Sequence, residues 1–150
     1  MRPVFLLALL LVLASCGQPA PRSSNGAIEI QNGYVAPSPA GVDLAAGYLT
    51  IANSGDQDQL VAVSSPRAAH VALHTMAMDG MVMRMRMVET MIVPAHGALT
   101  LSAGGDHLMF TGLNAPFKVG ESVPVHLRFE HGGEIDATLP ISVQPPRSGH

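Results

Sequence analysis

Short runs of alternating apolar and polar residues, separated by Gly, Pro, Asn and Ser, make up most of the chain from residue 27 onward. A period of two places successive side chains on opposite faces of a β-strand, and clusters of turn residues mark strand ends. No segment shows a sustained helical period with caps at both ends. The pattern predicts strands over residues 28–35, 47–52, 59–64, 71–75, 81–88, 98–101, 107–110, 123–130 and 134–141. We therefore expect an all-β domain, an antiparallel Greek-key β-sandwich or barrel.

The N-terminal segment has a different pattern. Arg2 is followed by an apolar stretch from Val4 to Ala14, which is too short to span a bilayer as a helix but suits a signal peptide. The stretch ends in Leu13-Ala14-Ser15-Cys16, which resembles a bacterial lipobox, in which the chain is cut before the cysteine and the thiol is lipidated. The alternative is an ordinary cleaved signal followed by an incidental cysteine.

These features predict four segments. Residues 1–15 form a lipoprotein signal peptide, 16–26 the lipidated cysteine and a flexible tether, 27–143 one domain, and 144–150 a disordered tail. We expect an exported protein anchored by lipid and facing the periplasm or the extracellular side. Gly17 is not the aspartate of an inner-membrane retention signal, which hints at the outer membrane in a host with two membranes.

Composition excludes several classes of function. Without Arg2 the chain has seven Lys/Arg against eleven Asp/Glu, a formal net charge of −4, which gives no footprint for nucleic acid. The single cysteine, Cys16, leaves no disulfide to form. The sequence contains no evident catalytic triad, carboxylate pair or phosphate loop, so we do not expect an enzyme.

Methionine is unusually concentrated in one part of the chain. Of nine methionines, seven fall between Met76 and Met91, and over residues 81–88 they alternate strictly with Val and Arg. Methionine is normally a sparse gap-filler in cores and is not favoured in strands. The cluster therefore indicates a soft core, a hydrophobic partner surface or a metal site.

Two histidines favour the metal site. His107 and Met109 are two apart in a predicted strand and so lie on the same face, and His74 and Met76 are related in the same way. Met85 belongs to the methionine face of the strand that follows His74. We expect three strands to bring His74, Met85, His107 and Met109 together near one end of a sheet.

The donor types select the metal. Two thioethers and two imidazoles with no thiolate suit Cu(I), and the lack of a carboxylate argues against Ca(II), Mn(II) and non-haem iron. A blue-copper electron carrier needs a Cys thiolate, which residues 27–143 lack. A closed set of four ligands leaves no protein-held open position, which favours carriage of copper over catalysis.

The pattern His74-x10-Met85-x21-His107-x-Met109 resembles the signature of the periplasmic copper chaperones called PCu(A)C. The flanking sequences resemble that family as well, over roughly residues 27–143: LHTMAMDG at 73–80, VMRMR at 82–86, IVPAHG at 92–97 and HLMFTGL at 107–113.

The resemblance implies a cupredoxin-like β-sandwich that binds one Cu(I) per chain, near the surface, through His74, Met85, His107 and Met109. It also implies delivery of copper to the CuA site of cytochrome c oxidase subunit II, often together with a Sco-type thiol protein. Some members carry a His/Met-rich C-terminal tail that binds Cu(II), whereas the tail here offers only His150, so we do not expect a second site there.

The remaining methionines and histidines are weaker candidates for copper ligands. We expect the other methionines of the cluster to pack around the site, with transient docking of copper as the alternative: Met76, Met78, Met81, Met83 and Met87. We interpret four further histidines as structural or surface residues: His70, His96, His126 and His131.

Three other functions compete with copper delivery. General copper resistance or storage would use the same ligands, and sequence does not separate it from delivery. A copper oxidase or monooxygenase would need an open coordination position or a second cofactor. A metal-free, adhesin-like β-sandwich would use the methionines as a partner surface.

Overall fold

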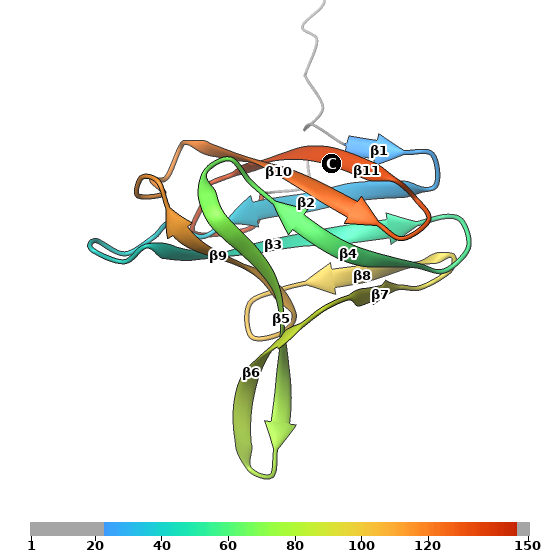
Figure 1. The fold of residues 1–150 in the computed structure, drawn as a ribbon, viewed down its shortest axis with the longest axis horizontal. Coiled ribbons are helices and arrows are strands. Elements are labelled where there is room, and N and C mark those ends of the chain that lie inside the picture. Colours follow the sequence, from blue (N-terminus) through green and yellow to red (C-terminus); the bar gives the residue numbers. More distant parts are fainter. Residues whose placement is uncertain (1–22, 147–150) are drawn as a thin grey trace, which may run out of the picture.

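The computed structural model describes residues 23–146, and every regular element in that range is a β-strand (Figure 1). The strands are β1 (Ser23–Asn25), β2 (Ile28–Val35), β3 (Leu44–Asn53), β4 (Asp58–Ser64), β5 (Ala68–Asp79), β6 (Val82–Val88), β7 (Met91–Val93), β8 (Gly97–Leu101), β9 (His107–Leu113), β10 (Ser122–Phe129) and β11 (Glu134–Pro140).

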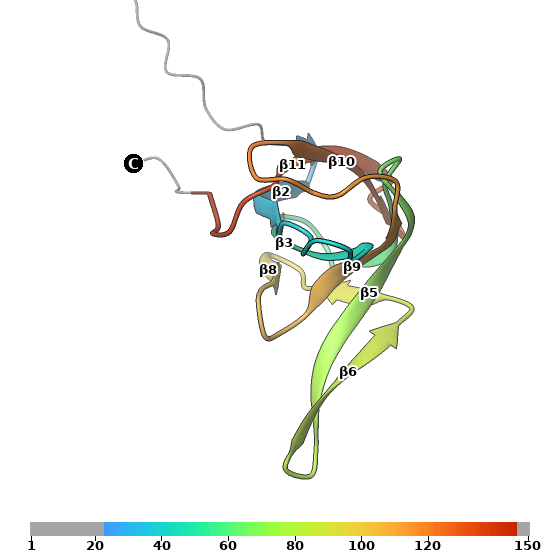
Figure 2. The ribbon, with the colours of Figure 1, turned by 90° about the vertical axis from the view of Figure 1, so that its left-hand side faces the viewer.

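The strands form two antiparallel sheets that pack as a sandwich. The larger sheet has the order β1-β2-β3-β9-β5-β6, with β8 also paired to β3, and the smaller has the order β11-β10-β4-β7. Figure 2 shows β10 and β11 of the smaller sheet above β3, β8 and β9 of the larger one. The predicted all-β antiparallel sandwich is confirmed.

The core lies between the two sheets and follows the alternation of the sequence. In β3 every second residue is buried, and in β10 and β11 the same period holds. Gly47 is needed within this packing because a Cβ there would lie 2.7 Å from Cε2 of Phe110. The largest fully buried side chains are Phe110, Phe117, Leu49, Ile51, Leu60, Leu108, Leu127 and Ile141.

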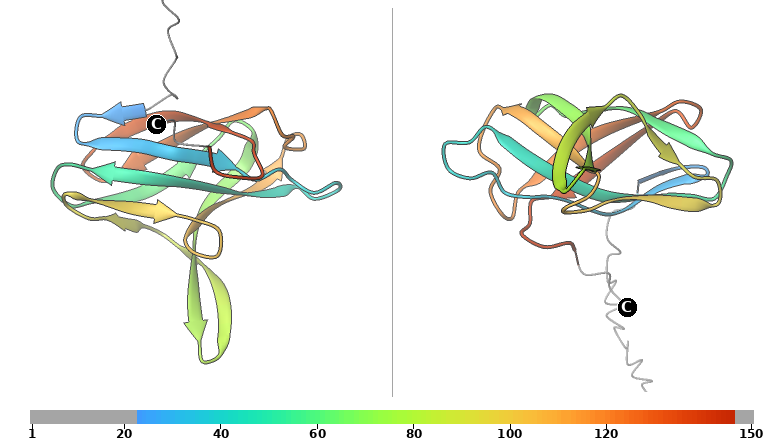
Figure 3. Two further views of the ribbon diagram at one scale, coloured as in Figure 1. Left: turned by 180° about the vertical axis from the view of Figure 1, so that it is seen from behind. Right: turned by 90° about the horizontal axis from the view of Figure 1, so that it is seen from below.

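Strand β5 is longer than the sequence predicts. The expected strand ended at Thr75, because Met76-Ala77-Met78-Asp79 lacks the β-branched residues typical of strands, yet β5 continues to Asp79. Pairing with β6 supports this extension, and Gly80, at φ +65°, opens the two-residue turn that joins the strands. The resulting hairpin projects beyond both sheets (Figure 1 and Figure 3, left).

Two short strands have no counterpart in the predicted pattern. β7 is only three residues long and pairs with the edge of β4, and β1 lies within the range expected to be tether. Strand β2 contains an irregularity: the β2–β3 register shifts between Gln31 and Tyr34, and Asn32 has a φ of 52°.

The predicted signal peptide, Cys16 and residues 147–150 lie outside the described residues. Within residues 23–146 no helix could cross a membrane.

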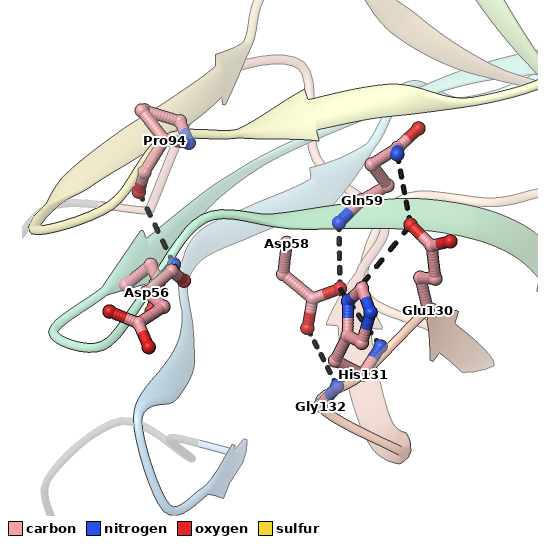
Figure 4. A network of polar contacts seen from close by, with 8 residues as sticks. Asp56, Asp58, Gln59, Pro94, Glu130, His131 and Gly132 are labelled. Carbon is pink, nitrogen blue, oxygen red and sulfur yellow. Dashed lines mark hydrogen bonds and ion pairs between the residues drawn. The ribbon is translucent and has the colours of Figure 1, made fainter.

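The carboxylate of Asp58, the first residue of β4, is hydrogen-bonded to the β10–β11 turn (Figure 4). Its carboxylate accepts hydrogen bonds from the backbone N–H groups of Gln59 at 2.7 Å, His131 at 3.0 Å and Gly132 at 2.6 Å. Burial raises the pKa of Asp58, but these donors outweigh burial and hold the pKa below its ordinary value.

We predict that Asp58→Ala lowers the free energy of unfolding by about 1–3 kcal/mol, because three N–H groups lose their acceptor. The contribution of the ionised Asp58 should be complete above the ordinary pKa of 3.8 and should be lost as pH falls through the lower folded-state pKa. Urea unfolding at several pH values measures both effects. Asp56→Ala, which removes an exposed carboxylate, is the matched control. Equal free energies of unfolding for the two variants would contradict the prediction.

Candidate metal centre

The register of the larger sheet gathers the four predicted donors on its outer face, away from the core. In the β5–β9 pair, His74 lies directly opposite His107, and Ala72 lies opposite Met109. In the β5–β6 pair, Met76 lies opposite Met85. Since His74 and Met76 point to the same side of β5, the outer face carries His74, Met85, His107 and Met109, contributed by three adjacent strands.

Two of the donors already touch. Nδ1 of His74 lies 2.8 Å from Sδ of Met85. The imidazole rings of His74 and His107 have centroids 5.5 Å apart and meet edge to face. Both rings and the thioether are thus close enough to share one small ion.

The backbone fixes the tautomer of His107. Nδ1 of His107 lies 2.9 Å from the carbonyl oxygen of Gly105, which can only accept, so Nδ1 carries the proton. Nε2 then keeps its lone pair, which is the arrangement of a histidine ligand whose second nitrogen is held by a carbonyl. Thr75 holds the same loop in place by donating to the Asp106 carboxylate at 2.6 Å.

Small neighbours leave room for Met109. Its side chain stands on the outer face of β9, with Ala72 of β5 on one side and Ala46 of β3 on the other. Tyr48 borders the site further along β3, with its ring 6.5 Å from that of His107. Burial, together with Tyr34, raises the pKa of Tyr48, so this phenol stays neutral beside the histidine.

The four donors differ in exposure, and Met85 on the hairpin is the most exposed. His107 is 7% exposed, His74 and Met109 are intermediate, and Met85 is 49% exposed. Among the described residues no three His, Cys, Asp or Glu side chains are grouped so that they could hold a metal ion, and the donors beside the two histidines are thioethers.

The electrostatic environment keeps His74 neutral. Partial burial lowers the pKa of His74, and the nearby His107 lowers it further, because a second positive charge would be unfavourable there. A neutral imidazole is the form that binds a metal, so this environment extends the pH range in which the site is ready for one.

The four other histidines among the described residues lie outside this cluster. His96 is in an exposed turn, His126 pairs with Asp136 on β10, and His131 is 74% exposed beside Asp58. His70 shares the outer face of β5 but pairs with Thr111.

Sequence reasoning missed three supporting residues: Thr75, Asp106 and Tyr48. Thr75 and Asp106 are neighbours in sequence of His74 and His107, so the antiparallel pairing of the two histidines would have placed them together. The alternation of β3 puts Tyr48 on the outer face, but nothing in the sequence indicates that β3 pairs with β9.

Comparison with known proteins identifies the family. The model of the family described as "Putative lipoprotein LpqE-like" matches residues 28–141. The chain belongs to the LpqE-like family. A relative from Leifsonia xyli subsp. xyli, named "Putative lipoprotein Lxx21020", is 27% identical over 149 residues, covering 94% of this chain and 89% of the relative.

Solved structures extend this LpqE-like assignment to PCu(A)C domains, confirming the predicted relationship. The solution structure of CuI-DR1885 from Deinococcus radiodurans is 31% identical, with a TM-score of 0.61, and covers 85% of this chain and 83% of that one. The copper-bound PCuAC domain from PmoF2 is 21% identical, with a TM-score of 0.72, and covers 83% of this chain and 100% of that one. This second likeness shows the fold alone.

We predict that His107→Ala raises the pKa of His74 toward its ordinary value of 6.5, since the substitution opens the ring to water and removes the neighbouring charge. Histidine ring NMR of the metal-free protein across pH measures this shift. His126→Ala, on the other sheet, is the control and should leave His74 unchanged. An unchanged pKa of His74 in the His107→Ala variant would contradict the inferred interaction between the two histidines.

Proposed function

We propose that this protein is an extracytoplasmic metallochaperone that binds one Cu(I) per chain through His74, Met85, His107 and Met109. The single observation that carries the proposal is the meeting of two imidazoles and two thioethers on one outer face, with Nδ1 of His74 2.8 Å from Sδ of Met85. This donor set suits Cu(I) rather than a hard cation. Two proteins of similar structure, the PCuAC domain from PmoF2 and CuI-DR1885, are described as holding copper, which supports copper as the metal here.

The two histidines would anchor the ion. His107 presents Nε2 from a buried, hydrogen-bonded ring, and His74 faces it across the β5–β9 pair. Both come from strands of the sandwich, so their separation is set by backbone pairing rather than by a loop. The thioethers stay uncharged at any pH, and only the histidines compete with protons for the metal.

Met85 would be the point of release. It is the most exposed of the four donors and belongs to the projecting β6 strand. An acceptor could replace Met85 first and then the donors behind it, so the ion need never be free. An acceptor richer in thiolate would draw Cu(I) forward, because thiolates bind it more strongly than thioethers do.

We propose delivery to the CuA site of cytochrome c oxidase subunit II, alone or with a Sco-type thiol protein. Export and anchoring through a lipid on Cys16 would place the site outside the cytoplasm. The family and the Leifsonia relative, both described as lipoproteins, support this placement.

We predict that Cu(I) titration against a chromogenic chelator gives one tightly bound ion, and that Met85→Leu, Met109→Leu and His107→Ala each weaken it. Leucine keeps most of the volume of methionine but lacks the sulfur donor. The controls are Met81→Leu at the hairpin turn and His70→Ala on the same face of β5, which should bind as the unaltered chain does. Unchanged Cu(I) binding in all three site variants would contradict the proposed site.

Delivery predicts a specific cellular defect. Deleting the gene should lower CuA loading of the oxidase at low copper, and the unaltered gene, but not the Met85→Leu form, should restore it. Copper tolerance at high copper is measured in parallel. Normal CuA loading together with reduced copper tolerance would contradict delivery and would instead support a role in copper resistance or storage.

A further inference from the structure

The β5–β6 hairpin carries sulfur on one face only. Its directly paired positions on that face are Met78 with Met83, Met76 with Met85, and His74 with Met87. On the opposite face the pairs are Asp79 with Val82, Ala77 with Arg84, Thr75 with Arg86 and Leu73 with Val88. Apart from His74, all of these paired positions on the first face are methionine, and none of those on the second face is.

Packing does not account for these methionines. Met78, Met83 and Met87 are 64%, 53% and 74% exposed, and the outer part of the hairpin extends away from the sandwich (Figure 2 and Figure 3). The expectation that the cluster packs around the site is therefore wrong for these three and for Met81, which is 98% exposed. A purely hydrophobic surface would not need thioethers, because Val, Ile and Leu bury as much apolar area and the β-branched ones suit strands better.

We propose that Met78 and Met83 form a second, weaker Cu(I) site near the tip of the hairpin, with Met76 as a third donor. Directly opposed side chains in an antiparallel pair have Cβ atoms about 5 Å apart, which lets the thioethers of long, flexible methionines converge. Sulfur donors without a thiolate or imidazole hold Cu(I) more weakly than the histidine site does.

The positions of the sulfur pairs give the second site a role. Successive pairs along a strand are about 7 Å apart, and the next pair after Met78 and Met83 is Met76 with Met85. Met85 in turn touches His74. The pairs form a thioether ladder along which an ion can exchange donors between the exposed tip and the histidines. The second site stands on its own donors, whereas this role as a route rests on the proposed function.

The salt bridges of the opposite face leave the ladder free. Asp79 forms ion pairs with Arg84 at 3.0 Å and with Arg86 at 3.7 Å. These charged side chains therefore pair with one another on the face of the hairpin opposite the methionines. The sulfur face thus presents neutral donors to a cation.

The test uses the full chain in detergent with Cys16→Ser, so that no thiol competes for the metal, under anaerobic conditions. Cu(I) is added stepwise while the ¹³C-labelled methionine methyl groups are followed by NMR. The first equivalent should shift Met85 and Met109, and the second should shift Met78 and Met83. The double variant Met78→Leu/Met83→Leu should lose the second equivalent and keep the first, while Met81→Leu should keep both.

His107→Ala separates this inference from the proposed function, because it should lose the first equivalent and keep the second. A first equivalent without any later shift at Met78 and Met83 overturns the second site alone and leaves the sulfur face as a protein-docking surface. A shift at Met78 and Met83 with no tight site overturns the proposed chaperone function alone. Absence of both equivalents overturns both.

Discussion

The antiparallel pairing of β5 with β9 is the constraint on which the candidate metal centre depends. It places His74 directly opposite His107, and beside this pair Thr75 donates a hydrogen bond to Asp106, the residue just before β9. A shift of one residue would turn one histidine toward the core and bring its neighbour to the outer face. The buried side chains of Leu73, Leu108 and Phe110 prevent that shift, so the hydrophobic core also sets the geometry of the metal centre.

Strand parity was readable from the sequence, whereas strand partners were not. Alternation alone indicates that His107 and Met109 share a face, because a period of two follows from the pleat. It does not indicate that β9 lies between β3 and β5, since that order depends on long-range packing. The sequence therefore does not place Tyr48 beside His107. It predicts a strand that ends at Thr75, because local strand preference carries no information on the pairing with β6 that extends β5 to Asp79.

The sandwich holds three of the donors in place, and the hairpin strand β6 carries the fourth. The two histidines come from strands held on both sides by neighbours, and the Gly105 carbonyl orients one of them. Met85 comes from β6, an edge strand with a single partner. A site built this way holds its imidazoles rigidly, while the thioether of Met85, a donor that tolerates many geometries, faces the solvent.

The outer-face position of the donors separates the cargo from the fold. In proteins whose metal ligands form the core, losing the ion means unfolding. Here Leu73, Leu108 and their buried neighbours lie on the opposite side of the same strands from the histidines, and no donor belongs to the hydrophobic cluster. The empty and loaded states can therefore share one folded scaffold, so the molecule can repeat its cycle without refolding between rounds.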